Sequence, residues 1–347
     1  MPDMQAWVLH GIRDLRLETR PIPVPKPGEV LIRMNHVGIC GSDLHYYEDG
    51  CIGDYVVTTP MILGHEGGGT VVEVGAGVTT LTPGDRVAIE PGVPCGHCDY
   101  CKTGRYNLCP DVVFQATPPY DGAFAQYIAW PAKMCFLLPD NISTLAGAMI
   151  EPLSVGMHAA MQGGARPGMT AVVLGSGCIG LMTMLALHSM GVSKVYVTDI
   201  QPKRLAMAGT LGATGVWNAV QRDTVKQVME FTHGRGADVV IETAGSAPTT
   251  AQTAELVAPG GTVVLVGMTP GGKLEYNLGA LMNKEATLKT VFRYRNLYPT
   301  CIDVASRLPV TDVVTHVFPF AETDRAMAEN SANRADIVKA AIVFDQA

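Results

Sequence analysis

The chain of 347 residues carries 32 acidic and 25 basic side chains, a formal net charge of −7, and only 16% of its residues are charged. This length favours two domains over one, and the lack of any run of like charge argues against a nucleic acid or an anionic membrane surface as the main partner. The N-terminus shows no basic segment followed by an apolar one, so no secretory signal is visible.

Extended segments punctuated by proline and glycine dominate up to about residue 150. Within them, Cys40 is followed 25 residues later by His65, which Glu66 adjoins. Cysteine, histidine and carboxylate are the mixed ligands of a catalytic zinc, which keeps one coordination position for water or substrate. Neighbouring side chains diverge on a regular strand, but Gly64 and Gly67 would allow an irregular turn that lets both converge. On spacing alone, an isolated core cysteine or histidine remains the alternative.

Four cysteines cluster in the next loop, at positions 95, 98, 101 and 109. Thiolates so close together converge on one tetrahedral metal ion, and four of them form a closed structural zinc site. An iron–sulfur cluster is the alternative, because Cys109 precedes a proline as in bacterial ferredoxins. Here the last gap is seven residues rather than three, and a second cluster motif is missing from the sequence. His97 could replace a thiolate or simply face solvent. The expected ligands are Cys95, Cys98, Cys101 and Cys109.

From Pro167 to Ser193 the chain has no Asp, Glu, Lys or Arg, which is long enough to suggest a membrane span. A Gly-Ser-Gly turn interrupts the segment near its centre and divides it into a strand and a helix. The pattern therefore favours a soluble strand–turn–helix unit, with no membrane partner.

The interrupting turn is a nucleotide-binding motif. The apolar segment Thr170–Leu174 predicts a buried parallel strand, a G-x-G-x-x-G turn follows, and strong helix formers come next. Gly175 would form the tight turn, Gly177 would let the backbone approach a pyrophosphate, and Gly180 would let the helix pack on the strand. Asp199 ends a second strand 24 residues after Gly175, where its carboxylate can accept hydrogen bonds from the adenosine ribose.

The charge of Asp199 would repel a 2′-phosphate, which favours NAD over NADP. Arg204 lies five residues later and could accept that phosphate, which leaves NADP as the alternative. Further apolar strands are expected at 238–242 and 261–266, so strand and helix alternate as in a doubly wound parallel sheet.

Several motifs together resemble zinc-dependent medium-chain dehydrogenases/reductases, and within them the polyol (sorbitol/xylitol) dehydrogenases. The superfamily motifs are at 64–75 and 83–88, and the motifs closer to the polyol enzymes are at 40–47, 104–108, 116–119, 150–156 and 291–294. They span nearly the whole chain in order. No motif singles out one polyol.

The resemblance implies an α/β protein with two parts. A mostly β, GroES-like catalytic domain would comprise residues 1–153 and 287–347, and a Rossmann NAD-binding domain would comprise residues 154–286. The family also implies a homotetramer, and a cytoplasmic location follows from a soluble enzyme with no export signal.

The resemblance also implies the reaction. A zinc ion held by Cys40, His65 and Glu66 would act as Lewis acid on a polyol hydroxyl, and hydride would pass to the nicotinamide. Ser42 and His45 resemble the relay that carries the proton out, although ordinary loop polar residues would look the same. Glu151 matches a carboxylate that lies at the zinc, as a fourth ligand or, as we favour, hydrogen-bonded to zinc-bound water. A surface salt bridge is its plainer interpretation.

The family positions extend both binding sites. Tyr46, Arg293 and Tyr294 match substrate contacts, although Arg293 could equally be an exposed cation. In the family an arginine at Arg204 accompanies NAD and would lie along the adenosine. The remaining expected cofactor residues are Ile179, Val266, Gly267, Met268, Val291, Phe292 and Arg293.

Other classes predict different sequences. A zinc-free quinone reductase of the same fold would lack Cys40 and the His65-Glu66 pair, and a non-catalytic relative would lose the relay or Glu151. Both sets are present here. Threonine and simple alcohol dehydrogenases share both zinc motifs but not the Phe292-Arg293-Tyr294 segment, and they remain the enzymatic alternative.

Overall fold

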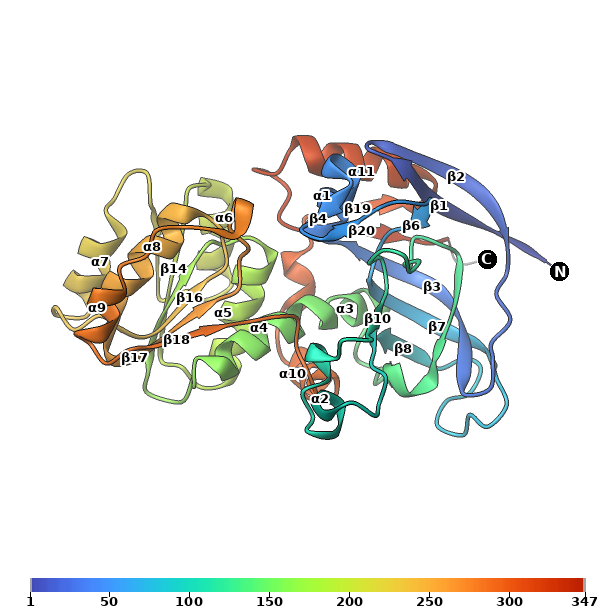
Figure 1. Cartoon of the computed structure of the whole chain (residues 1–347), viewed down its shortest axis with the longest axis horizontal. Coiled ribbons are helices and arrows are strands. Elements are labelled where there is room, and N and C mark those ends of the chain that lie inside the picture. The colour runs from blue at the N-terminus through green and yellow to red at the C-terminus, as the bar shows by residue number, and fades with distance from the viewer. Residues whose placement is uncertain (1, 346–347) are drawn as a thin grey trace. The chain divides into compact units, whose positions relative to one another are not determined.

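The computed structural model describes residues 2–345, which form two compact units (Figure 1). The first unit combines Met1–Glu151 with Tyr298–Ala347, and the second is Pro152–Leu297. Each unit has its own sheets and its own apolar core.

The first unit is mostly β. Its largest sheet has the order β12-β8-β7-β3-β20-β19, with β11 also paired to β3, and β2-β1-β6 form a second sheet. The elements before residue 100 are β1 (Asp3–Gly11), β2 (Asp14–Pro21), β3 (Glu29–Ile39), α1 (Gly41–Asp49), β4 (Cys51–Ile52), β5 (Tyr55–Val56), β6 (Met61–Ile62), β7 (Glu66–Val74), β8 (Arg86–Ile89), β9 (Gly92–Val93) and α2 (Asp99–Lys102). Those that follow are η1 (Tyr106–Leu108), β10 (Val113–Phe114), β11 (Tyr127–Pro131), η2 (Ala132–Met134), β12 (Cys135–Leu137) and α3 (Thr144–Ala148). Helix α4 (Ile150–Gln162) begins at the end of this unit and belongs mostly to the second. The C-terminal segment adds α10 (Tyr298–Ala305), η4 (Val310–Val313), β19 (His316–Pro319), η5 (Phe320–Glu322), α11 (Thr323–Ala332) and β20 (Ala340–Val343).

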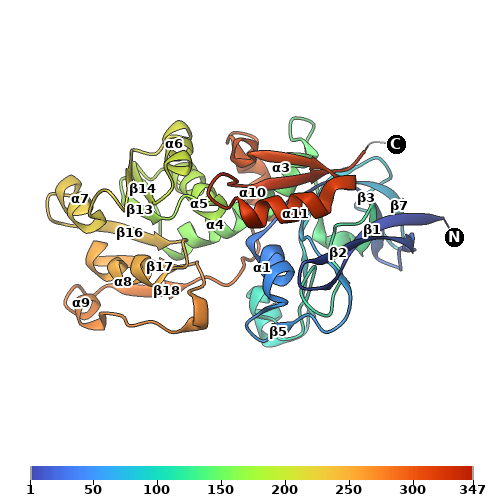
Figure 2. The same cartoon turned by 90° about the horizontal axis from the view of Figure 1, so that it is seen from above.

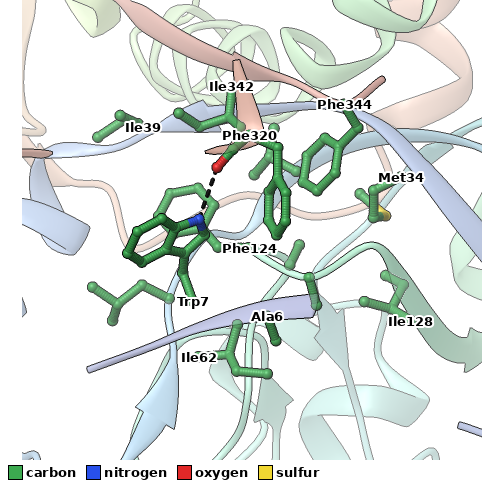
Figure 3. Packing of buried hydrophobic residues seen from close by; sticks show 14 of the residues in the cluster. Ala6, Trp7, Met34, Ile39, Ile62, Phe124, Ile128, Phe320, Ile342 and Phe344 are labelled. Carbon is green, nitrogen blue, oxygen red and sulfur yellow. Dashed lines mark hydrogen bonds between the residues drawn. The ribbon is translucent and has the colours of Figure 1, made fainter. Parts of the chain in front are cut away.

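The two ends of the chain share one core in this unit. The indole N–H of Trp7 in β1 donates a buried hydrogen bond of 2.7 Å to the carbonyl of Phe320, and Phe124 packs beside them (Figure 3). The rings of Phe320 and Phe344 stack with centroids 4.6 Å apart. A buried indole N–H that lacks an acceptor costs free energy, so this bond favours packing of the C-terminal segment against β1.

The second unit is a doubly wound parallel sheet with the strand order β15-β14-β13-β16-β17-β18. Figure 2 shows α5 and α6 on one side of the strands and α8 and α9 on the other. The elements are β13 (Thr170–Leu174), α5 (Cys178–Ser189), β14 (Lys194–Asp199), α6 (Pro202–Thr210), β15 (Gly215–Asn218), α7 (Thr224–Phe231), β16 (Ala237–Glu242), α8 (Ala247–Leu256), β17 (Val257–Leu265), η3 (Pro270–Gly272), α9 (Leu278–Met282) and β18 (Thr287–Thr290). The strand order reverses between β13 and β16, where such sheets bind nucleotides. The expected fold class is confirmed.

Both domain boundaries differ from the sequence prediction: the first unit ends at Glu151 rather than at residue 153, and the second boundary differs more. The sequence predicts residues 287–290 in the catalytic domain, yet they form β18, which pairs in parallel with β17. The backbone N–H of Val291 continues this pairing with a 2.9 Å bond to the carbonyl of Leu265. The second unit therefore runs to Leu297. All four residues of β18 are exposed, so the strand lacks the apolar run that would have marked it.

The uncharged segment 167–193 holds β13 and α5. Across residues 2–345, every helix is too short or too polar to cross a membrane.

Candidate active site and metal centres

Cys40, His65 and Glu66 converge in the first unit, with their ligand atoms all within 4.8 Å of one another. Cys40 is the N-cap of α1, His65 directly precedes β7, and Glu66 is the first residue of that strand. Gly64 has φ +88°, a left-handed conformation, so the chain turns sharply just before the pair. One thiol, one imidazole and one carboxylate form a donor set that fits zinc.

A buried carboxylate that the sequence analysis did not assign organises this trio. Asp43 accepts 2.9 Å hydrogen bonds from the backbone N–H groups of Cys40 and Gly64, and its Oδ1 lies 3.7 Å from Nδ1 of His65. Burial opposes its charge, but His65 and these N–H groups hold the pKa of Asp43 below its usual value. With Nδ1 turned toward Asp43, Nε2 is the ring nitrogen left for a metal.

Lys339 forms a buried ion pair with Glu66. Its Nζ lies 2.6 Å from Oε1 of Glu66 and also contacts Oε2. The same Nζ donates to the carbonyl of Ile39 at 3.0 Å, and Lys339 is only 4% exposed. A Cβ on Gly38 would lie 2.0 Å from Oε2 of Glu66, so a larger residue there would have to displace this carboxylate oxygen. The Glu66 carboxylate is therefore closely surrounded by Lys339 and Gly38.

The expected relay residues lie on α1. Ser42 and His45 are three residues apart and therefore on one side of the helix. Nδ1 of His45 lies 3.3 Å from Oδ2 of Asp49 on the same helix, and both side chains are half exposed. Tyr46 is buried. Glu48 links this helix to Ser331 of α11 through a 2.5 Å hydrogen bond, and to Arg334 just beyond α11 through an ion pair. Helices α1 and α11 are drawn in Figure 1.

Glu151 is 6% exposed at the start of α4, near a second buried acid, Glu90. Burial raises the pKa of Glu90 to about 7; a hydrogen bond from Tyr106 opposes this rise and the charge of Glu151 adds to it. The Tyr106 hydroxyl donates to Oε1 of Glu90 at 2.6 Å. Because Ile89 pairs with Gly67, Glu90 follows the end of β8 beside the start of β7. The sequence analysis missed Glu90, because its partners Tyr106 and Glu151 are distant in sequence.

The four cysteines of the loop also converge, with their sulfurs within 4.8 Å of one another. Sγ of Cys98 is 3.5 Å from that of Cys101, and Sγ of Cys95 is 3.9 Å from it. Backbone N–H groups of His97 and Cys98 lower the pKa of Cys95 to about 6, whereas burial raises that of Cys101 to about 12. Metal binding must therefore displace protons from at least part of the set. We call residues 95–109 the four-cysteine lobe.

In the second unit, the glycine turn joins β13 to α5. Gly175 has φ +99°, and a Cβ on Gly180 would lie 2.0 Å from the carbonyl oxygen of Gly175. Gly177 is the N-cap of α5 and leaves the helix end without a side-chain cap. Unpaired N–H groups at such a helix start form a ready anion site, which fits the pyrophosphate of a dinucleotide. Ile179 follows in the first turn of α5.

Asp199 ends β14 beside this turn. Its Oδ2 accepts from the backbone N–H and the hydroxyl of Ser176, at 2.6 and 3.0 Å. Its Oδ1 accepts from the backbone N–H groups of Ile200 and Gln201, at 2.7 and 2.9 Å. Nη1 of Arg204 lies 3.6 Å from the Cβ position of Gly177. The carboxylate of Asp199 and the guanidinium of Arg204 therefore both lie beside the glycine turn, at the expected adenosine end of the site.

The residues after β17 are paired with the backbone of Glu242. Its carbonyl accepts from the N–H groups of Val266 and Gly267, at 2.9 and 3.1 Å. A Cβ on Gly267 would lie 2.2 Å from the backbone nitrogen of Gly245, so that position is closed to larger residues. Met268 is 71% exposed.

The last predicted segment follows β18. Val291 is half-buried, Phe292 is half exposed, and the guanidinium of Arg293 stacks over the Phe292 ring at 4.8 Å. Arg293 has a φ of +55°, and Tyr294 is buried. These residues belong to the second unit, whereas Tyr46, Glu151 and the zinc trio belong to the first.

Two family descriptions match the chain. "Alcohol dehydrogenase GroES-like domain" matches residues 26–140, and "Zinc-binding dehydrogenase" matches residues 178–307. Fold and donor sets therefore define a zinc-binding dehydrogenase of the medium-chain type.

Similarity to individual proteins indicates which family within this class the chain resembles. The chain is 47% identical to a zinc-type alcohol dehydrogenase-like protein of Escherichia coli K12 (94% of this chain, 95% of that protein). It is 44% identical to the sorbitol dehydrogenase of Bacillus subtilis 168 (94% and 93%) and 41% identical to probable D-xylulose reductase A of Aspergillus clavatus (96% and 95%).

Solved structures agree on the fold. A zinc-binding dehydrogenase of Sinorhizobium meliloti 1021, bound to NADP, superposes with a TM-score of 0.92 at 29% identity (99% of this chain, 100% of that chain). An alcohol dehydrogenase of Escherichia coli CFT073, complexed with NADH, gives 0.91 at 28% (99% and 99%). The chain belongs to the polyol dehydrogenase family of the zinc-dependent medium-chain dehydrogenases/reductases, and it is an oxidoreductase.

Proposed function

We propose that this protein reversibly oxidises a secondary hydroxyl of a sorbitol- or xylitol-like polyol to the ketose, with NAD as hydride acceptor and zinc as cofactor. The observation that carries the proposal is the convergent donor set of Cys40, His65 and Glu66. Relatives named sorbitol dehydrogenase and D-xylulose reductase support a polyol as the substrate.

Each residue at the trio has a proposed task. Cys40, His65 and Glu66 hold the catalytic zinc, which when bound supplies Lewis-acid activation of the substrate hydroxyl. Asp43 fixes the His65 ring, and Lys339 fixes Glu66. Ser42 and His45 carry the released proton outward along α1, where His45 is half exposed to solvent.

Substrate recognition needs several hydrogen-bonding side chains, because an unpaired hydroxyl in a closed site costs about 1–3 kcal/mol. We assign Tyr46, Arg293 and Tyr294 to the polyol, from the resemblance of their motifs. Glu151 is assigned to a zinc-bound water. A second zinc is proposed in the four-cysteine lobe as a structural ion, held by Cys95, Cys98, Cys101 and Cys109.

The test of the reaction is NAD reduction across a panel of polyols and simple alcohols, before and after zinc chelation. We expect turnover of secondary hydroxyls in polyols and its loss on chelation. Turnover of short primary alcohols alone, or activity indifferent to chelation, would refute the proposal. Preference for threonine would favour the alternative zinc dehydrogenases.

NAD is proposed over NADP because Asp199 places a negative charge at the adenosine ribose end of the turn. The expected site comprises Gly175, Gly177, Ile179, Gly180, Asp199, Arg204, Val266, Gly267, Met268, Val291, Phe292 and Arg293. Asp199→Ser should lower the ratio of kcat/KM for NAD to that for NADP. Ser176→Ala, which removes one bond to Asp199 but keeps its charge, is the matched control and should retain the ratio. An unchanged ratio in Asp199→Ser contradicts the assignment.

We also propose that the protein forms a homotetramer and is located in the cytoplasm. β18 lies at one end of its sheet and all four of its residues are exposed, which suits pairing with a second copy in the homotetramer expected of the family. The nine cysteines are free thiols, which suits a reducing cytoplasm. Light scattering would measure the assembly.

A further inference from the structure

The four-cysteine lobe raises the question of how an ion reaches its site. A shell of four thiolates is closed and leaves no coordination position open. During loading and release the ion is bound by only part of this set, so donors beside the set can bind the ion on its path.

A second donor set borders the tetrad. Donor atoms of Cys95, His97 and Asp111 lie within 4.8 Å of one another, and Cys95 belongs to both sets. Thiol, imidazole and carboxylate are all zinc ligands. The two sets therefore share the sulfur of Cys95. An ion that stays bound to this sulfur can exchange its other ligands without leaving the protein.

Exposure separates the two sets. His97 and Asp111 are exposed, whereas Cys109 is buried and Cys98 and Cys101 are half-buried. An ion arriving from solvent meets the exposed donors first. Nδ1 of His97 lies 3.0 Å from the carbonyl oxygen of Cys95, so the ring is already held beside the shared cysteine.

We propose that Cys95, His97 and Asp111 form an outer zinc site through which Zn²⁺ enters and leaves the four-cysteine lobe. The ion binds the outer donors with water in its remaining position. Cys98, Cys101 and Cys109 then replace His97, Asp111 and the water while Cys95 stays bound. Each thiol that binds gives its proton to solvent, and no electron transfer is involved.

The inference rests on the proposed structural zinc, and the experiment separates the two. Full-length protein carrying His65→Ala, which loses the catalytic ligand set, is loaded with zinc so that the lobe's ion alone is followed. A chromophoric chelator in excess then reports the rate of zinc release, and a metal-specific dye reports uptake after removal of the chelator. Total zinc per chain is measured separately.

Two variants are compared in that background. His97→Ala/Asp111→Asn removes the outer donors. Asp99→Asn removes an exposed acid of the same lobe that is outside both sets, so it controls for the loss of negative charge. Because the outer site lies on the path in both directions, we expect the double variant to release and take up zinc at least about tenfold more slowly, with one zinc per chain retained. Asp99→Asn should match the parent.

Three results would overturn the inference. Release and uptake within about twofold of the parent would show that the outer donors are not on the path. A zinc content below one per chain in the double variant would make them resident ligands instead. Absence of lobe zinc in the parent itself would refute the structural zinc along with the loading site.

Discussion

The two proposed metal-ligand sets of the first unit contrast in how the chain builds them. The four-cysteine lobe draws its ligands from 15 consecutive residues, 95–109, and holds them in a loop with little regular structure. The trio draws on α1, on β7, and on the supporting side chain of Lys339, which is 273 residues from Glu66 in sequence.

The surroundings differ in the same way. Lobe sulfurs are mostly half-buried and are supported by backbone N–H groups. At the trio, His65 and Glu66 are buried, and each is held by a charged side chain, Asp43 or Lys339. A local set can thus stabilise a loop by binding metal, whereas a set built on the sheet is held in place before metal binds. Substitutions in the two sets should therefore have different effects on activity and on stability.

The largest effect should come from His65→Ala. It removes a ligand of the trio, so we expect turnover to fall by at least about 10⁴-fold, about 5 kcal/mol of transition-state stabilisation, with one zinc lost per chain. Far-ultraviolet circular dichroism should be unchanged because the sheet around it is intact. Retained turnover with full folding would disprove the catalytic role.

Cys98→Ser should act on stability instead. Losing one thiolate opens the lobe, and we expect the loss of a zinc and of more than about 4 kcal/mol in the free energy of unfolding. Urea unfolding of zinc-loaded protein measures this. The control is Cys135→Ser, a buried free cysteine outside both sets, whose zinc content should stay at the wild-type value. If Cys98→Ser keeps both its zinc and its stability, the contrast between the sets fails.

Lys339→Met should separate the metal-free from the zinc-loaded protein. It leaves Glu66 as a buried charge without its ammonium partner, so the metal-free protein should lose about 3–5 kcal/mol. Zinc would compensate the same charge, so the loss should shrink when the ion is bound. Lys284→Met is the control, because Lys284 binds three backbone carbonyls rather than a carboxylate. Its loss should be equal with and without zinc. An equal loss for Lys339→Met as well would contradict the compensation.

Glu90→Gln probes the link between the two sets, since Tyr106 of the lobe donates to Glu90 beside the start of β7. Burial raises the pKa of Glu90 from 4.5 to about 7, so the folded protein holds a proton across this window that the unfolded chain has lost. Stability conferred by Glu90 therefore falls as the pH rises from 4.5 to 7 and is constant above.

We expect the substitution to remove this fall, which amounts to about 1–3 kcal/mol, and unfolding at pH 5 and pH 8 measures it. Tyr106→Phe is the comparison. It removes a hydrogen bond that favours the charged form, so the window should extend to higher pH. An identical pH dependence in wild type and Glu90→Gln would show that Glu90 does not titrate there.

Local patterns carried most of what the sequence predicted correctly. The apolar run 170–174 and the strand 194–199 are β13 and β14, because strands buried on both faces need β-branched apolar residues along their length. The glycine turn and the cysteine spacing were equally readable, since each places its chemistry within a few residues.

Long-range partners were beyond the same reasoning. In the sequence, nothing distinguishes Lys339 from other lysines, or Gly38 from the other glycines of the chain. Only the pairing of β20 and β7 with β3 brings the ammonium, the carboxylate and the missing Cβ together. The sequence analysis also failed to predict β18, because an exposed edge strand carries no apolar pattern.

The sequence by itself therefore determined the nucleotide turn, the cysteine cluster and the presence of a cysteine, a histidine and a glutamate suited to zinc. Tertiary structure decided that these three side chains meet, which buried charges hold them, and that Tyr106 joins the lobe to Glu90. The physical reason is range. Backbone conformation and close ligand spacing depend on adjacent residues, whereas the compensation of a buried charge depends on groups that only the folded sheet brings into contact.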